Sequence, residues 1–242
     1  MASYADILIC AATRAELPGD LPSNVSLLEC GIGPARTALE LCRFLERAGG
    51  GAAGSGSRPR LILMTGIAGC YRHAAGRDPL PAGGDEEIGP LDVVVAEKEV
   101  FLDLGRCSHD AFSFIEIDGR QVAYEFDLSE YASIFVPHSI REALSFKSAG
   151  FGTVCCSSAS MQRAEAMRRG RPRVWVENME GAAAAMVARE YDIPFIEIRA
   201  ISNYAGEPDR AKWDIEGALS LLRSAIVALF ERSEAIKALV KG

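Results

Sequence analysis

Apolar residues gather along the chain in short runs, and each run stops at glycines or polar side chains. Strands are predicted over residues 6–12, 25–30, 60–65, 91–101, 151–156 and 195–201, and another short strand begins at Val174. The runs over residues 6–12 and 60–65 have the pattern of buried strands. Strands that are apolar on both faces are typical of parallel sheets covered by helices. The pattern therefore predicts a buried central sheet.

Between several of these strands the apolar positions follow helical spacing instead. Helices are predicted over residues 35–47, 138–148, 159–169 and 215–239, and an alanine-rich helix follows the acidic turn Glu177-Asn178-Met179-Glu180. Ser157 and Ser158 are predicted to cap the helix over residues 159–169. A hairpin around Asp118-Gly119 is predicted from residues 112–117 and 121–126.

The alternation of strands and helices indicates an α/β protein. We expect a single domain over residues 1–242, with three layers (α/β/α) and a mixed, mostly parallel central sheet. The low-complexity stretch at about residues 49–58 predicts a flexible insertion, and residues 72–89 predict a loop. No internal repeat or second domain is indicated.

Composition narrows the class of protein. A formal net charge of -7 and a pI near 5.1 argue against a surface for nucleic acid or anionic membranes. The seven cysteines have no zinc-ligand spacing and an odd count, which favours free thiols in a reducing cytosol. No signal peptide is indicated, and the apolar runs are too short to span a bilayer. A cytoplasmic protein is expected.

Common motifs for nucleotides and catalysis are missing. Gly31-Ile32-Gly33-Pro34 lacks the spacing of GxGxxG, and neither GxxxxGK[ST] nor GxSxG occurs. The histidines are scattered without supporting cysteine or aspartate spacing, so neither a metal site nor a cofactor is predicted.

Acids and an amide stand instead at the ends of predicted strands. They are Glu16, Glu177, Glu180 and Asn203. Ligands of α/β sheets bind outside the carboxyl ends of the strands, so these side chains are expected to surround one pocket. A carboxylate there can act as a general base on water or accept both hydroxyls of a ribose.

The block ENMEGAAAAMVAREYDIPFIEIRAISNY, from Glu177 to Tyr204, carries a family resemblance. It resembles the signature region of the nucleoside phosphorylase and nucleosidase family. Within that family it is similar to methylthioadenosine/S-adenosylhomocysteine nucleosidases and more similar to futalosine hydrolases. GIGPAR, MTGIAG and the LDVVV strand extend the resemblance over most of the chain.

The resemblance implies a role for each matching residue. Glu16 would deprotonate the attacking water with Arg199 nearby, and the turn Asn178-Met179-Glu180 would hold the ribose. Ala68 and Gly69 would line the base, and Ser202 and Asn203 would engage the purine edge. Ser160 stands where adenine-specific nucleosidases have a stacking phenylalanine, which leaves the stacking partner open. Phe101 and Met161 are candidates for an apolar 5′ side, with core packing as the alternative. The resemblance also implies a homodimer.

Asn203 stands where the adenine-specific relatives have an aspartate. An amide can donate to O6 of a 6-oxopurine and accept from N7–H, while a protonated aspartate suits adenine. A mismatched buried polar pair costs roughly 1–3 kcal/mol, so hypoxanthine is favoured over adenine as the leaving base. The alternative is that Asn203 only caps a turn.

Water is favoured over phosphate as the nucleophile. Related phosphorylases place an arginine two residues before the strand-end glycine, where this chain has Met64. The implied reaction is hydrolysis of futalosine to hypoxanthine and dehypoxanthine futalosine, in menaquinone biosynthesis. The alternatives are a methylthioadenosine/S-adenosylhomocysteine nucleosidase, a purine nucleoside phosphorylase and a catalytically silent nucleoside-binding module.

Overall fold

The computed structural model describes residues 6–49, 57–73, 87–107, 112–118, 120–121, 124–169, 171 and 173–241. Most of the predicted insertion at about residues 49–58 and of the predicted loop at residues 72–89 lies outside these ranges. The strands are β1 (Ile7–Ala11), β2 (Val25–Glu29), β3 (Leu61–Cys70), β4 (Val93–Phe101), β5 (Gly105–Cys107), β6 (Phe112–Phe114), β7 (Glu116–Ile117), β8 (Arg120–Gln121), β9 (Glu125–Asp127), β10 (Lys147–Thr153), β11 (Val174–Asn178) and β12 (Phe195–Tyr204). The helices are α1 (Pro34–Gly49), α2 (Ser129–Phe135), α3 (His138–Leu144), α4 (Met161–Arg168), α5 (Gly181–Glu190), α6 (Ile215–Arg232) and α7 (Glu234–Lys241), with 3-10 turns η1 (Arg14–Glu16) and η2 (Arg210–Lys212).

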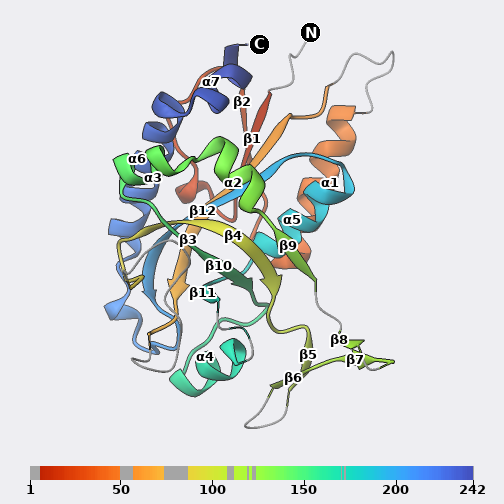
Figure 1. Cartoon of the computed structure of the whole chain (residues 1–242), viewed down its shortest axis with the longest axis vertical. Helices are drawn as coiled ribbons and strands as arrows, with labels where there is room; N and C mark the ends of the chain where they lie inside the picture. The colour runs from red at the N-terminus through yellow and green to blue at the C-terminus, as the bar shows by residue number, and fades with distance from the viewer. Residues whose placement is uncertain are drawn as a thin grey trace.

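A mixed sheet of eight strands runs through the middle of the molecule (Figure 1). Its order is β11-β10-β4-β12-β3-β1-β2, with β9 added beside β4. Most neighbours are parallel, whereas β4 runs antiparallel to β12 and to β9. Strand β11 pairs with β10 and also, antiparallel, with β3. This second pairing closes part of the sheet on itself, a feature that the sequence pattern did not predict.

Helices cover both faces of the sheet, which confirms the predicted three-layer α/β class. Figure 1 shows α1 and α5 on one side and α6 and α7 on the other. Alternate residues of the same strand fill the two cores: Leu8 and Cys10 pack with α1 and α5, and Ile7 and Ile9 pack with α6. Among the described residues, no helix is long and apolar enough to cross a membrane.

Several predicted helix ends were wrong. Helix α3 ends at Leu144 because Ser145 adopts a left-handed φ of 54° and Phe146 turns into the core. Ser160, rather than Ser157 or Ser158, caps α4 and accepts from the Arg163 amide. The predicted helix over residues 215–239 breaks at Ser233, whose hydroxyl donates to the Phe135 carbonyl at 2.7 Å.

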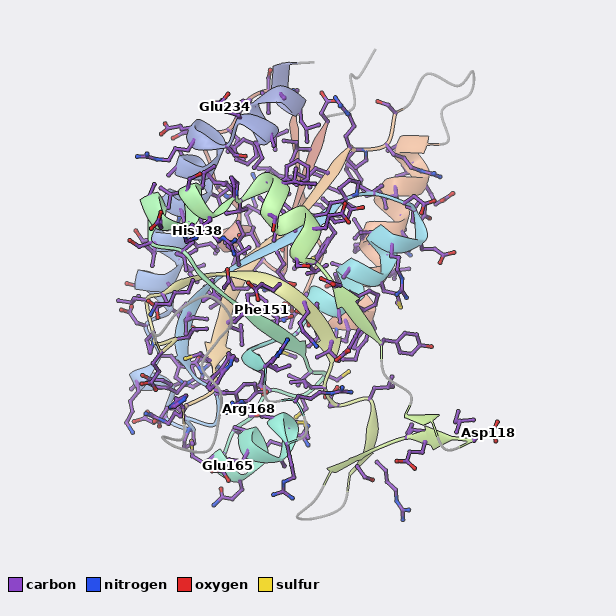
Figure 2. All side chains as sticks on the ribbon, viewed as in Figure 1. Asp118, His138, Phe151, Glu165, Arg168 and Glu234 are labelled. Carbon is purple, nitrogen blue, oxygen red and sulfur yellow. The ribbon has the colours of Figure 1, made fainter. Side chains whose placement is uncertain are left out.

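The hairpin at Asp118 is shorter than predicted. Among the residues that the structure describes here, β7 and β8 pair across the turn, while β6 pairs with β5 and β9 joins the main sheet. Figure 2 shows Asp118 at the tip of this hairpin, away from the body of the molecule. Helix α2 was not predicted, although Ala132 and Phe135 give it a buried face.

Candidate active site

A cavity of about 460 Å³ opens at the carboxyl ends of β1, β3, β11 and β12. Its volume is within the usual range for small-molecule sites. Most of the predicted site residues line it, namely Glu16, Ala68, Gly69, Asn178, Met179, Glu180, Ser202 and Asn203. Strand ends that are far apart in the sequence therefore meet at one place, as expected for this class of sheet.

Glu16 is buried on η1 and held by three hydrogen bonds. Its Oε2 accepts from the amide and hydroxyl of Thr13, each at 2.8 Å, and its Oε1 accepts from the Ile67 amide at 3.0 Å. The carboxylate thus has a fixed orientation at the edge of the cavity. A carboxylate oxygen has more than one acceptor site, so Glu16 can still accept from a water molecule.

The turn between β11 and α5 is organised by Asn178. Its Oδ1 accepts from the amides of Glu180 at 2.9 Å and Gly181 at 2.7 Å. The Glu180 carboxylate accepts from the Gly33 amide at 3.1 Å and from Arg199 Nη1 at 3.2 Å. Gly33 has a φ of 89°, which favours glycine, so the turn after β2 reaches this carboxylate by its backbone.

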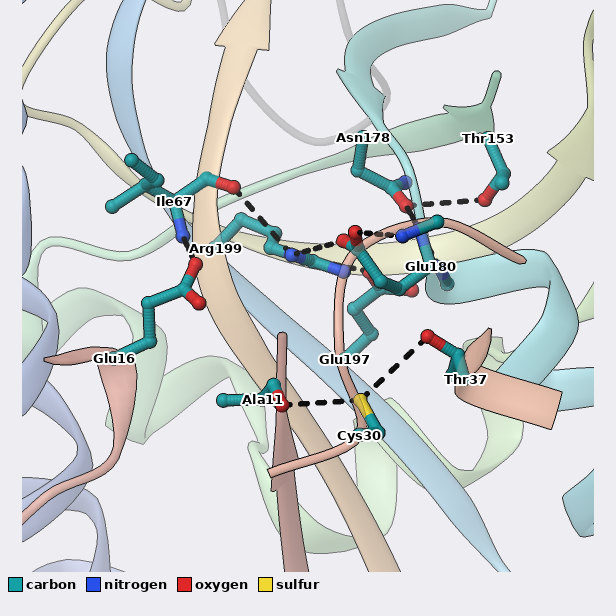
Figure 3. Close-up of polar contacts among 12 residues, drawn as sticks. Ala11, Glu16, Cys30, Thr37, Ile67, Thr153, Asn178, Glu180, Glu197 and Arg199 are labelled. Atoms are coloured by element: carbon teal, nitrogen blue, oxygen red, sulfur yellow. Dashed lines mark hydrogen bonds and ion pairs between the residues drawn. The ribbon is translucent and has the colours of Figure 1, made fainter. Parts of the chain in front are cut away.

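Arg199 does not line the cavity but lies fully buried behind it. Figure 3 shows its guanidinium beside Glu180 and Glu197, and it shows Glu16 beside Ile67 of β3. Its Nε donates to Glu197 Oε1 at 2.8 Å. Burial lowers the pKa of Arg199, but the carboxylates of Glu197, Glu180 and Glu16 outweigh burial and hold the pKa above its usual value. Arg199 is therefore a permanent cation that fixes Glu180.

Ser202 and Asn203, which the sequence predicts to recognise the base, also line the cavity. The Ser202 hydroxyl can donate to Asn203 Oδ1 at 2.8 Å or to the Ala68 carbonyl at 3.2 Å. Asn203 Nδ2 donates to the Tyr204 carbonyl at 3.0 Å. The amide of Asn203 is thereby oriented, and each of its polar atoms retains one further donor or acceptor site.

Phe101 and Met161, the candidates for an apolar 5′ side, do not line the cavity. Phe101 packs edge-on against Tyr124 with ring centroids 6.5 Å apart, and Met161 is the exposed first residue of α4. Apolar contact comes instead from Trp213, Ile215 and Leu219, at the start of α6. These residues were missed, although Asp214 after Trp213 is a recognisable N-cap residue.

Glu177 also lines the cavity, as expected from the sequence, and its hydrogen bonds hold a neighbouring loop. Glu177 accepts from Tyr71, from the Ser158 amide and from the Ser158 hydroxyl at 2.6–2.8 Å, and so braces the loop before α4. Ser160 caps α4 and does not line the cavity. Within the described part of the chain, no group of three or more His, Cys, Asp or Glu residues could hold a metal ion.

Comparisons with known proteins agree with this geometry. A family model described as the phosphorylase superfamily matches residues 19–236. A futalosine hydrolase of Streptomyces coelicolor is 31% identical over 211 residues, which cover 85% of this chain and 78% of that protein. A 5′-methylthioadenosine/S-adenosylhomocysteine nucleosidase of Lysinibacillus sphaericus is 25% identical over 79% of this chain and 73% of its own length. The structure of a futalosine hydrolase mutant of Helicobacter pylori covers 94% of this chain and 99% of its own, with a TM-score of 0.68 and 18% identity. These similarities confirm the predicted family resemblance and fold class.

Proposed function

The chain belongs to the phosphorylase superfamily, and from that premise we propose that it hydrolyses the N-glycosidic bond of futalosine. Its similarity to futalosine hydrolases identifies it as a hydrolytic N-glycosidase. Futalosine as the substrate is our proposal. The products are hypoxanthine and dehypoxanthine futalosine, which places the reaction in the futalosine route of menaquinone biosynthesis. The cytoplasmic location and the homodimeric state expected from the sequence remain predictions.

The observation that carries the substrate proposal is Asn203 in the cavity. Its amide is oriented by Ser202 and by the Tyr204 carbonyl. An amide donates to the O6 of hypoxanthine and accepts from N7–H as the base departs. With the amide held in this orientation, the amine of adenine would face the amide N–H, donor against donor, and one hydrogen bond would stay unmade.

The proposed mechanism divides the work among three side chains. The C1′–N9 bond lengthens into an oxocarbenium-like state and the departing base takes up a proton at N7 from solvent water. Asn203 accepts a hydrogen bond from that N7–H, and Glu180 holds the ribose hydroxyls. Glu16 accepts a proton from water, whose oxygen then attacks C1′. A placed general base contributes typically ~10²–10⁴-fold in rate.

Water rather than phosphate fits the charges around the cavity. A phosphate nucleophile needs cations or free amides to neutralise it. Arg199 is occupied by Glu180 and Glu197, and Met64 lies fully buried in the core. The carboxylate of Glu16 would repel phosphate and suits a water molecule.

A methylthioadenosine/S-adenosylhomocysteine nucleosidase is the second candidate, favoured by the 25% identical relative from Lysinibacillus sphaericus. The test is incubation with futalosine, methylthioadenosine and inosine, each with and without phosphate, with free base measured by chromatography. We expect hypoxanthine from futalosine, without phosphate, at the highest rate. Faster release of adenine would refute the assignment of the base, and a phosphate requirement would refute hydrolysis.

Asn203→Asp is expected to shift the preference toward adenine. An aspartate that gives its one proton to N7 faces the O6 of hypoxanthine with a lone pair, whereas it can accept a hydrogen bond from the amine of adenine. The ratio of adenine release to hypoxanthine release should rise about ten- to hundredfold. Because the ratio is measured on one enzyme, a general loss of stability cancels. An unchanged ratio would mean that the base is recognised elsewhere.

A further inference from the structure

Behind Glu180, on the side away from the cavity, lie two more acids. Glu99 on β4 and Glu197 on β12 are both fully buried. Their carboxyl groups meet at one turn: Glu99 accepts from Asn178 Nδ2, Asn178 Oδ1 accepts from the Gly181 amide, and Glu197 lies against Gly181. We call these two residues the acid pair. Neither belongs to the reaction as described above.

Glu197 has a partner on one oxygen only. Its Oε1 accepts from Arg199 Nε at 2.8 Å. Its Oε2 is buried and accepts no hydrogen bond from an N–H group or a hydroxyl among the described residues. This carboxylate also lies against Gly181, the first residue of α5, where any side chain would collide with it. A hydrogen bond from a protonated neighbour is what Oε2 needs to be satisfied.

Glu99 is the neighbour that can supply this proton. Its oxygens accept from Asn178 Nδ2 at 3.0 Å, from the Thr153 hydroxyl at 2.8 Å and from the Val100 amide at 3.2 Å, and all three partners are neutral. Burial, and then the charge of Glu197, raise the pKa of Glu99 well above its usual value. Burial also raises the pKa of Glu197, but Arg199 opposes this effect. The proton therefore resides on Glu99, and the negative charge stays beside Arg199.

We propose that Glu99 and Glu197 share a single proton at neutral pH and act as positioning residues for the ribose-binding turn. The proposal rests on the role of Glu180 in the proposed function. One arm runs from Glu197 through Arg199 to the Glu180 carboxylate. The other runs from Glu99 through Asn178 to the Glu180 amide. The two arms fix the backbone and the side chain of the same residue.

The proton can be tested through stability. The charged groups that face the pair are Arg199 and Glu180, and Thr153 and Asn178 are neutral. A raised folded pKa means that the unfolded chain releases the Glu99 proton once the pH exceeds the ordinary value of 4.5. Stability is then lost as pH rises from that value toward the folded pKa.

Urea unfolding of the wild type and of Glu99→Gln, from about pH 5 to pH 8, tests the shared proton. Glutamine keeps an N–H for Glu197 but does not titrate. Relative to the variant, the unfolding equilibrium constant of the wild type should rise by up to about tenfold per pH unit. Parallel curves would overturn the proposal. Infrared spectroscopy of the wild type gives a second test without a variant: the carbonyl band of a buried carboxylic acid should persist at neutral pH, and its absence also contradicts a shared proton.

The positioning role has its own readout, the preference for a ribose over its 2′-deoxy analogue. Glu99→Ala removes the partner of Asn178, and we expect it to reduce this preference about tenfold or more, with rescue by Glu99→Gln. Glu125→Gln is the matched control, because Glu125 is exposed on β9 beside the same strand. A merely structural role would slow both substrates equally and leave the preference unchanged, which would overturn the proposal. If the wild type shows no such preference, the fault lies with the assigned role of Glu180, and the stability test still decides on the proton.

Discussion

Glu16→Gln lowers kcat about 10²–10⁴-fold with little change in KM, because glutamine cannot accept a proton from the attacking water. The amide oxygen can still accept from the Ile67 amide or from Thr13, so the side chain should keep its place. Circular dichroism and urea unfolding verify that the fold is retained, and release of free base measures the rate.

Glu29→Gln is the matched control for this variant. Glu29 also lies at a strand end, opposite Ala11 in the sheet, but it is exposed and does not line the cavity. It should keep wild-type activity. A Glu16→Gln enzyme with wild-type kcat would show that another group activates the water.

Arg199→Met has the largest expected effect on stability. It leaves the buried carboxylates of Glu180 and Glu197 without their cation. Removal of one partner from a buried ion pair typically costs about 3–5 kcal/mol, so the variant should be strongly destabilised or unfolded. Urea unfolding gives the change in the free energy of unfolding.

Arg43→Met tests whether this cost comes from burial. Arg43 also pairs with a glutamate, Glu40, at 3.0 Å, but its side chain is 52% exposed. Exposed pairs are worth about 0–1 kcal/mol, so this variant should unfold close to the wild type. Adding Glu197→Gln to Arg199→Met should recover part of the lost stability, since it removes one unpaired charge. Equal losses in the two arginine variants would contradict a role for burial.

The central strands and the edge of the sheet that carries the site could be predicted, because both depend on local pattern. The run over residues 6–12 is buried as β1, and the run over residues 60–65 is buried in β3 beside it. The proximity of Glu16, Glu180 and Asn203 could be predicted without knowledge of tertiary contacts, because the carboxyl ends of parallel strands meet at one edge of a sheet.

Features that depend on contacts between distant segments could not be predicted. The break at Ser233 is set by a hydrogen bond to Phe135, nearly a hundred residues earlier in the chain. Trp213 enters the cavity only because α6 begins beside β12. Glu99 and Glu197 are visible as acids inside apolar runs, but only their contacts with the turn Asn178–Gly181 show that they meet.

The second pairing of β11, with β3, also has a thermodynamic consequence for ligand binding. A strand with hydrogen bonds on both sides loses its conformational freedom when the chain folds. The residues that follow it, Met179 and Glu180, are therefore held in place before a nucleoside arrives. Ordering a loop on binding would subtract from affinity, and here that entropic loss belongs to folding instead.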